Sequence, residues 1–190
     1  MWRSFPKCWG SFDRRVKGLE NFNLLISTWR GKESLACSET WYLLKEVGDP
    51  EAQVDRTSIR GLVVARTRLD AVETVEKLKA LLAERPEEFR YVLKVIPIHE
   101  VVPANLEEIA AASRKLASKI GAEEKFKVEV EKRYTSLHRA EIIEAVAREV
   151  NRKVDLKHPD KVLLIEVLGS KAGVSLLKPS DILSVAKEKI

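Results

Sequence analysis

The stretch KHPDKVLLIEV, at residues 157–167, combines a stiff turn with a nearly continuous apolar run. Pro159 fixes its own φ angle and pushes His158 towards an extended conformation, while Asp160 can accept hydrogen bonds from nearby backbone amides. The apolar run at 162–168 lacks the alternation of a strand with one wet face, so it indicates a strand that is covered on both faces. The stretch therefore predicts a turn that leads into a central, buried strand.

The tetrapeptide HPDK at 158–161 also occurs in the loop of J-domain co-chaperones, where it joins two helices that pair as an antiparallel hairpin. Helical spacing would then continue after the loop, but the residues that follow here form a β-rich run that ends at Gly169. The extended sequence VDL at 154–156 also separates the turn from the preceding helix. We therefore reject a chaperone function for this turn.

Helix and strand patterns alternate around this central strand. FKVEVEKR at 126–133 alternates, with Phe126, Val128 and Val130 on one face and charged residues on the other, which predicts a half-buried strand. Asn105 and Glu108 resemble a capping box at the start of a helix. Helices are expected at 105–120 and 139–152, and a further strand at 173–177. Residues 104–190 are therefore predicted to form one α/β domain.

The preceding part of the chain, residues 21–103, shows the element order β-α-β-β-α-β. Strands are expected at 22–28, 52–58, 61–66 and 91–98, and helices at 32–47 and from Asp70 to the residue before Pro86. Two split β-α-β units in this order describe a ferredoxin-like sandwich. The chain is therefore predicted to be an α+β protein, with a ferredoxin-like domain followed by the α/β domain.

Residues 1–20 are predicted to form a basic, aromatic tail. Four aromatic residues alternate there with five cationic residues, among them Arg14 and Arg15. Aromatic rings among cations can stack on bases and contact phosphates, but the same rings can instead pack on the first domain. Both interpretations of the tail stay open.

The distribution of charge favours an anionic partner without requiring one. The net charge of +5 divides into +4 in residues 1–18, −2 in 19–103 and +3 in 104–190. A basic excess at both ends fits RNA, although the charged surface of a thermophilic protein, which the abundant Lys, Arg and Glu resemble, would look the same. Because the sequence has neither a membrane-length apolar run nor a secretory signal, we expect a soluble, cytoplasmic protein.

Patterns typical of catalytic or metal sites are missing from the sequence. His99, His138 and His158 lie on different predicted elements, and none has a metal-binding partner at short spacing. Cys8 and Cys37 do not form a CxxC pair, and no P-loop, GxSxG or GxGxxG motif occurs. We therefore expect no catalytic residues, metal or cofactor, and a protein that is not an enzyme.

Basic loops and helix ends supply the candidate RNA contacts. KRYTSLHR at 132–139 leads from a strand into a helix N-terminus, where free amides and the helix dipole favour a phosphate. We expect the charges of Arg133 and Arg139 to face solvent, whereas Arg148 could instead pair with Glu144. The predicted RNA-binding residues are Lys132, Arg133, His138, Arg139, Arg148, Arg152, Lys157 and Lys171, together with Arg14 and Arg15 of the tail.

Three of these segments together resemble a THUMP domain over about residues 105–180: FKVEVEKR, LHRAEIIEAVAREV and KVDLKHPDKVLLIEVLGSKAGVSLL. The strongest parts of the resemblance are Lys132-Arg133, the turn from Asp155-Leu156 to Pro159-Asp160, Glu166, and Gly173-Val174-Ser175. THUMP domains occur in thiouridine synthases, methyltransferases and deaminases that modify tRNA. The resemblance implies that this domain binds RNA, at the acceptor end of tRNA, and leaves the chemistry to a companion.

A ferredoxin-like segment followed by a THUMP-like segment also resembles the stand-alone THUMP proteins that serve RNA cytidine acetyltransferase as tRNA-binding adaptors. That enzyme makes N4-acetylcytidine, so the resemblance implies tRNA and the acetyltransferase as partners. Two alternatives stay open. The protein could be a tRNA-binding subunit of another modification enzyme, for thiolation or methylation, or a regulatory protein that binds a small ligand.

Overall fold

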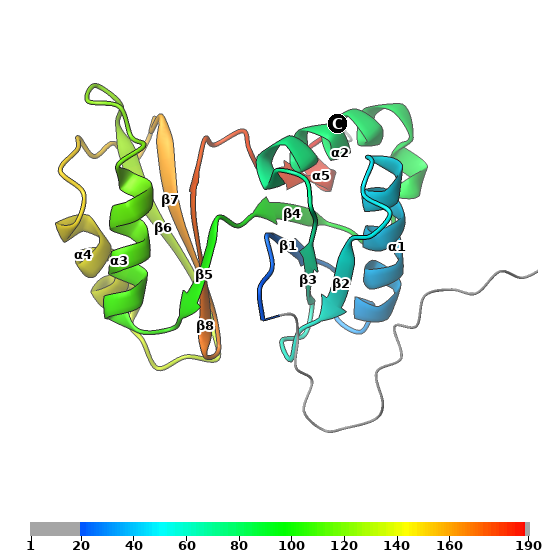
Figure 1. Ribbon diagram of the computed structural model, residues 1–190, viewed down its shortest axis with the longest axis horizontal. Helices are drawn as coiled ribbons and strands as arrows, with labels where there is room; N and C mark the ends of the chain where they lie inside the picture. The colour runs from blue at the N-terminus through cyan, green and yellow to red at the C-terminus, as the bar shows by residue number, and fades with distance from the viewer. Residues whose placement is uncertain (1–19, 189–190) are drawn as a thin grey trace, which may run out of the picture.

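Two β-sheets with helices on their outer faces make up the computed structural model, which describes residues 20–188 (Figure 1). The first sheet has the strand order β2-β3-β1-β4-β9, and all its neighbouring strands are antiparallel. The order of β1 to β4 is that of a ferredoxin-like sandwich, as predicted. Its elements are β1 (Leu24–Ser27), α1 (Glu33–Glu46), β2 (Gln53–Arg56), β3 (Leu62–Arg66), α2 (Ala71–Glu84), a 3-10 turn (Pro86–Glu88), β4 (Lys94–Pro97), β9 (Leu183–Ser184) and α5 (Val185–Glu188).

The second sheet has the strand order β5-β8-β7-β6, in which β6 and β7 are parallel and the other pairs are antiparallel. Helices α3 and α4 pack on one face of this sheet through a core of their own. The predicted α+β class is confirmed. The elements are β5 (Glu100–Pro103), α3 (Leu106–Ala117), β6 (Phe126–Arg133), α4 (Arg139–Arg148), β7 (Lys161–Leu168) and β8 (Lys171–Leu177).

Short polar residues start the helices where the sequence predicts. The Asp70 carboxylate accepts hydrogen bonds from the amides of Val72 and Glu73, at 2.9 and 3.0 Å, and so begins α2. Asn105 Oδ1 accepts one from the amide of Glu108 at 2.9 Å and begins α3. Each bond satisfies an amide that has no partner inside the helix.

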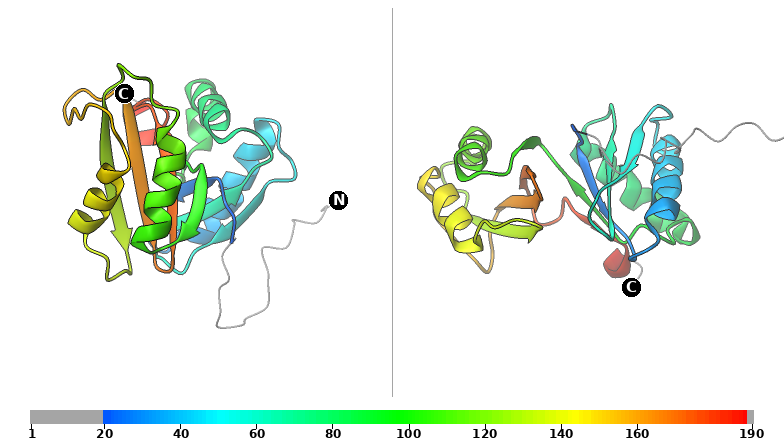
Figure 2. Two further views of the ribbon diagram at one scale, coloured as in Figure 1. Left: turned by 60° about the vertical axis from the view of Figure 1, so that its left-hand side comes forward. Right: turned by 90° about the horizontal axis from the view of Figure 1, so that it is seen from below.

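The inner faces of the two sheets pack against each other, so the molecule is layered as helices, sheet, sheet and helices (Figure 2). Strand β7 alternates between the two sides. Val162 and Leu164 join the core between the sheets, whereas Leu163 and Ile165 join the core beneath α3 and α4. The prediction of a strand covered on both faces is confirmed. Burying each such side chain is worth roughly 1.5–3 kcal/mol, so this interdomain core holds the two domains together.

The Gly-Val-Ser segment of β8 forms part of the seam between the domains. A Cβ atom added at Gly173 would lie 3.1 Å from the Ile98 side chain, which is tighter than ordinary packing. The buried hydroxyl of Ser175 donates a hydrogen bond to the carbonyl of Pro97 at 2.8 Å. Gly173 and Ser175 therefore let the end of β4 lie directly against β8.

Strand pairing divides the chain differently from the predicted domains at 21–103 and 104–190. Strand β5 lies in the second sheet, where Glu100 is opposite Val174. Strand β9 returns to the first sheet, where Lys94 is opposite Ser184. Because the chain crosses between the sheets at both ends of the second domain, the two domains are joined by two connections. The predicted tail at 1–20 lies outside the described residues, except for Glu20.

The HPDK segment is a turn, as predicted, and two carboxylates hold it. Asp155 accepts hydrogen bonds from the amides of His158 and Lys157, at 2.9 and 3.0 Å, and from Lys125 Nζ at 3.1 Å. These contacts, with the His158 amide first, lower the pKa of Asp155 to about 2. Asp160 accepts from the Lys125 amide at 2.8 Å. The turn is therefore fastened to the start of β6 and aims β7 into the sheet.

Candidate nucleic-acid interface

The carboxyl ends of β5, β6 and β7 meet at one edge of the second sheet, which we call the carboxyl edge. Strands β6 and β7 are parallel, and β5 runs in the same direction because both β5 and β7 are antiparallel to β8. Helix α3 follows β5 and helix α4 follows β6, so both helices begin at this edge, on the lower side of Figure 1. Ligands of sheets with parallel strands bind preferentially at such an edge.

Several polar side chains predicted from the sequence lie at the carboxyl edge. Lys132 is exposed near the end of β6, and His138 is exposed at the start of α4, where its amide donates to Glu141 at 3.1 Å. Tyr134 follows β6 with a positive φ of 53° and a side chain that is 74% exposed. Lys171 begins β8 and donates through Nζ to the carbonyl of Glu20 at 3.1 Å. The edge thus combines cations, an aromatic ring and two helix N-termini.

Arg133 also lies at this edge, but its guanidinium group points into the protein. Nη1 of Arg133 is 2.8 Å from Oε2 of Glu166, whose side chain is only 2% exposed. Burial raises the pKa of Glu166, and the Arg133 charge opposes that effect without reversing it. Arg133 therefore neutralises a buried carboxylate, and the expectation that its charge faces solvent is wrong.

Arg139 is likewise bound within the protein. Its Nε donates to the carbonyl of Val130 at 2.9 Å, its Nη2 contacts the same carbonyl, and Nη2 lies 3.4 Å from Glu131 Oε1. The side chain is still 58% exposed, so one side of the guanidinium group stays accessible. Arg139 covers a carbonyl on the outer edge of β6, a group that would otherwise be open to pairing with another strand.

The remaining predicted residues lie at the opposite end of the second domain. Arg148 ends α4 and pairs with Glu144, the alternative considered from the sequence. Arg152 donates to the carbonyls of Ile120 and Gly121, at 3.2 Å each, where the chain leaves α3. Lys157 is exposed in the turn before β7. These three residues therefore do not share a surface with the carboxyl edge, and Arg14 and Arg15 lie outside the described residues.

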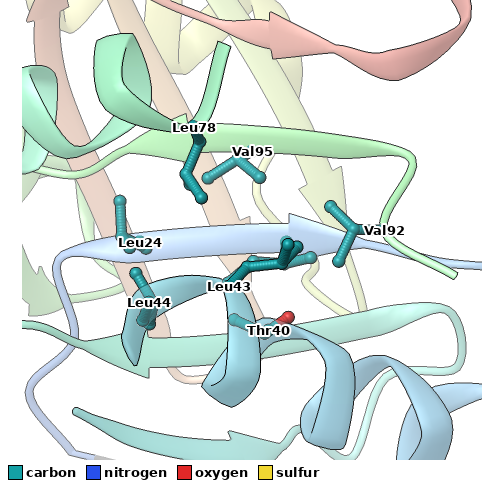
Figure 3. A pocket seen from close by; sticks show the side chains of 8 residues that line it. Leu24, Thr40, Leu43, Leu44, Leu78, Val92 and Val95 are labelled. Atoms are coloured by element: carbon teal, nitrogen blue, oxygen red, sulfur yellow. The ribbon is translucent and has the colours of Figure 1, made fainter. Parts of the chain in front are cut away.

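Among residues 20–188, no group of three or more His, Cys, Asp or Glu side chains could hold a metal ion. The first domain contains a cavity of about 10 Å³ between α1, α2 and the first sheet (Figure 3). Its lining is apolar except for Thr40, so it offers a water molecule fewer polar partners than such sites provide. This cavity is too small for an organic ligand. No helix in the described part of the chain is long and apolar enough to cross a membrane.

A second exposed cationic group, outside the set predicted from the sequence, lies on the first domain. Arg30 and Lys32 are in the loop between β1 and α1, next to Trp29, and Arg60 is in the turn between β2 and β3. The signal in the sequence is the dipeptide Arg-Gly, which occurs in both loops. The two loops are nearly thirty residues apart, so the dipeptide alone does not predict that they meet.

Comparisons with known proteins identify the second domain. Residues 103–177 match the family model of the THUMP domain. No curated protein sequence matches the chain. Among solved structures, TrmN from Thermus thermophilus has 18% identity and a TM-score of 0.55, with 80% of this chain and 44% of that chain covered.

Two further structures have the same arrangement. PH1313 from Pyrococcus horikoshii has 20% identity and a TM-score of 0.53, with 82% of this chain and 55% of that one covered. A 4-thiouridine synthetase in complex with RNA and ATP has 15% identity and a TM-score of 0.51, with coverages of 86% and 42%. The chain thus spans about half the length of these proteins. At such identities the likeness concerns the fold, and the family match shows that residues 103–177 form a THUMP domain.

Proposed function

We propose that this protein is a non-catalytic, tRNA-binding adaptor that presents tRNA to an RNA cytidine acetyltransferase for the formation of N4-acetylcytidine. The observation that supports RNA binding is the carboxyl edge of the THUMP domain, where exposed Lys132, His138 and Tyr134 lie beside the N-termini of two helices. Helix N-termini and lysines favour phosphates, and an exposed ring favours an unpaired base. The 4-thiouridine synthetase whose fold is similar was crystallised with RNA.

The single-stranded acceptor end of tRNA is the ligand we assign to this edge. Sequence-specific proteins preferentially bind RNA ends and loops, because their bases can unstack and turn towards the protein. Lys132 and Lys171 would contact phosphates on either side of a base that stacks on Tyr134. The resemblance to THUMP proteins supports this choice of RNA segment.

The adaptor role assigns the chemistry to a second protein. Binding energy in one chain can hold a target base in the active site of another, which raises the rate by positioning. The resemblance to stand-alone THUMP adaptors supports acetylation as the reaction. Thiolation or methylation of tRNA by another partner is the alternative. Because the fold is similar to that of a 4-thiouridine synthetase, the modification assay below includes this alternative.

Binding is tested by titrating tRNA at several salt concentrations with matched lysine variants. Lys132→Ala with Lys171→Ala should weaken binding and reduce the salt slope by roughly 0.7–0.9 for each phosphate that is no longer neutralised. Lys157→Ala is the control, because Lys157 is an exposed lysine at the opposite end of the domain. Equal decreases in affinity for the control and the double variant would mean that the carboxyl edge has no special part in binding.

The adaptor role is tested by nucleoside mass spectrometry of tRNA incubated with acetyl-CoA, ATP and the acetyltransferase. The expected result is more N4-acetylcytidine with both proteins than with the enzyme alone, and none with the adaptor alone. Product from the adaptor alone would refute the non-enzyme assignment. If both proteins together make no more than the enzyme, acetylation is the wrong reaction, and the same assay with thiolation or methylation enzymes decides the alternative.

A further inference from the structure

Two loops of the first domain are tied together by the carboxylate of Glu33. Oε1 of Glu33 accepts hydrogen bonds from the amide of Gly31 at 3.1 Å and from the amide of Gly61 at 2.7 Å. These amides, that of Gly61 first, lower the pKa of Glu33. Both glycines have positive φ, of 82° and 80°, which other residues adopt only with strain. The loops are therefore built to lie side by side.

The turn between β2 and β3 is also fixed from within. The hydroxyl of Thr57 lies 2.9 and 3.0 Å from the carbonyl oxygens of Ile59 and Leu62, which share its one proton, and it accepts a hydrogen bond from the Ile59 amide at 3.0 Å. The Ile59 side chain is 5% exposed and belongs to the core between the two sheets. The turn is thus anchored to the interdomain seam, and its position relative to the second domain is defined.

The tied loops display an aromatic ring among cations, which we call the Trp29 platform: Trp29, Arg30, Lys32 and Arg60. Trp29 is 60% exposed, and the three cations are exposed as well. None of the three forms an ion pair with a described residue, whereas Arg133, Arg139 and Arg148 all do. The nearby Glu33 carboxylate is occupied by backbone amides. The charge of Arg60 also acts on Glu33, but three cations outnumber this one carboxylate, so the platform keeps a net positive charge for a ligand.

The Trp29 platform lies on the same side of the molecule as the carboxyl edge. Leu168, the last residue of β7 at that edge, packs against the interdomain core to which Ile59 belongs. Two views show the turn between β2 and β3 on the lower side, as they do the turn between β7 and β8 (Figures 1 and 2). A strand of RNA bound at the carboxyl edge can therefore continue along the first domain.

We infer that the Trp29 platform is a second RNA-binding site, which takes a single-stranded nucleotide of the same RNA that binds at the carboxyl edge. A base stacks on the Trp29 ring, and the neighbouring phosphates contact Arg30, Lys32 and Arg60. Stacking on an exposed aromatic ring accepts any base, so the site requires an unpaired nucleotide but no particular sequence. This inference rests on the proposed function, because it extends the path of the bound tRNA.

Fluorescence titration with tRNA and with a single-stranded oligonucleotide tests the platform. Trp29→Ala should weaken binding of both ligands by about tenfold, and Trp29→Phe should retain most of the affinity, because phenylalanine can also stack. Trp29→Ala should leave the salt slope unchanged, since the ring contacts no phosphate. Arg30→Ala with Arg60→Ala should reduce the slope by roughly 0.7–0.9 for each phosphate that is no longer neutralised.

Tyr42→Ala is the matched control, because Tyr42 is another exposed ring of the first domain but lies beside Glu46 and Glu88. It should bind both RNAs like the wild type. An oligonucleotide with abasic sugars should bind the wild type and Trp29→Ala equally, because it has no base to stack.

Three outcomes would overturn the inference, and they can be told apart. Wild-type protein that binds no tRNA at low salt refutes the proposed function and this extension with it. Wild-type binding with unchanged affinity in Trp29→Ala, and a normal thermal melt, refutes only the platform. If Trp29→Ala binds RNA normally but no longer binds the modification enzyme, the platform is a protein-docking surface instead.

Discussion

Replacing Arg133 with alanine should destabilise the protein by about 3 kcal/mol at pH 7, because the buried carboxylate of Glu166 loses its partner. Glu166 is 2% exposed, and its Oε2 lies 2.8 Å from Arg133 Nη1. Breaking such a buried pair costs about 3–5 kcal/mol, and the lower end applies because the Arg133 side chain is itself 35% exposed. In a chain of this length the destabilisation corresponds to a fall of about 6–12 °C in Tm.

The destabilisation caused by Arg133→Ala should depend on pH, because it depends on whether Glu166 carries a proton. Burial raises the pKa of Glu166 in the folded protein, so the folded state holds its proton more tightly than the unfolded state does. The contribution of Glu166 to stability is then fully present below its pKa in the unfolded state, and it declines as the pH rises through its pKa in the folded state. Removing Arg133 raises the folded pKa further. The difference between wild type and variant should therefore shrink as the pH falls from 7 towards 4.

Urea denaturation followed by circular dichroism, at several pH values, measures this effect. Arg133→Ala with Glu166→Gln should recover most of the stability at pH 7, because a neutral amide costs less to bury than an unpaired carboxylate. Lys132→Ala is the control on the same strand. Because the Lys132 side chain is exposed, this substitution should change the free energy of unfolding by less than about 0.5 kcal/mol. A cost below about 1 kcal/mol for Arg133→Ala, or no recovery in the double variant, would refute the reasoning.

Three further predictions concern stability. Thr40→Val should raise the free energy of unfolding by about 1 kcal/mol, because the buried Thr40 hydroxyl has no hydrogen-bond partner among the described residues. Thr74→Val should lower the free energy of unfolding by about the same amount, because the Thr74 hydroxyl donates to the carbonyl of Asp70 at 2.6 Å. If the two substitutions change Tm equally in thermal melts, both predictions are wrong. Asp155→Asn should lower Tm at pH 7. Folding depresses the pKa of Asp155 from 3.8 to about 2, so its contribution is present above pH 3.8 and disappears towards pH 2, and the Tm difference should vanish over that range rather than persist.

Local periodicity was sufficient to predict most of the helices and strands. The alternation in FKVEVEKR predicts a strand at 126–133, and β6 spans Phe126–Arg133. The continuous apolar run after Pro159 predicts a strand with two buried faces, and β7 has them. These patterns depend only on which faces of a helix or strand are exposed to solvent, so residues close together in the sequence are enough to predict them.

Features that depend on pairing between distant segments could not be predicted in this way. Strand β9 has two residues, and it exists because it pairs with β4, which lies almost ninety residues earlier. Glu166 alternates onto the face of β7 that is turned towards the first domain, and that face is identified only once the second sheet is placed against the first. The Trp29 platform likewise requires Glu33 to bring two separate loops together.

Three arginines of the THUMP domain differ in task from Lys132, and this difference decides how RNA binding should be mapped. Arg133, Arg139 and Arg152 each bind a buried carboxylate or backbone carbonyls, which suits a planar group with several fixed donors. Lys132 is exposed and forms no ion pair with a described residue, so its charge is available to phosphates. Substituting the arginines would therefore lower RNA binding partly by destabilising the fold. Variants of Lys132, compared with the wild type at equal stability, test the RNA interface without disturbing the contacts that hold the fold.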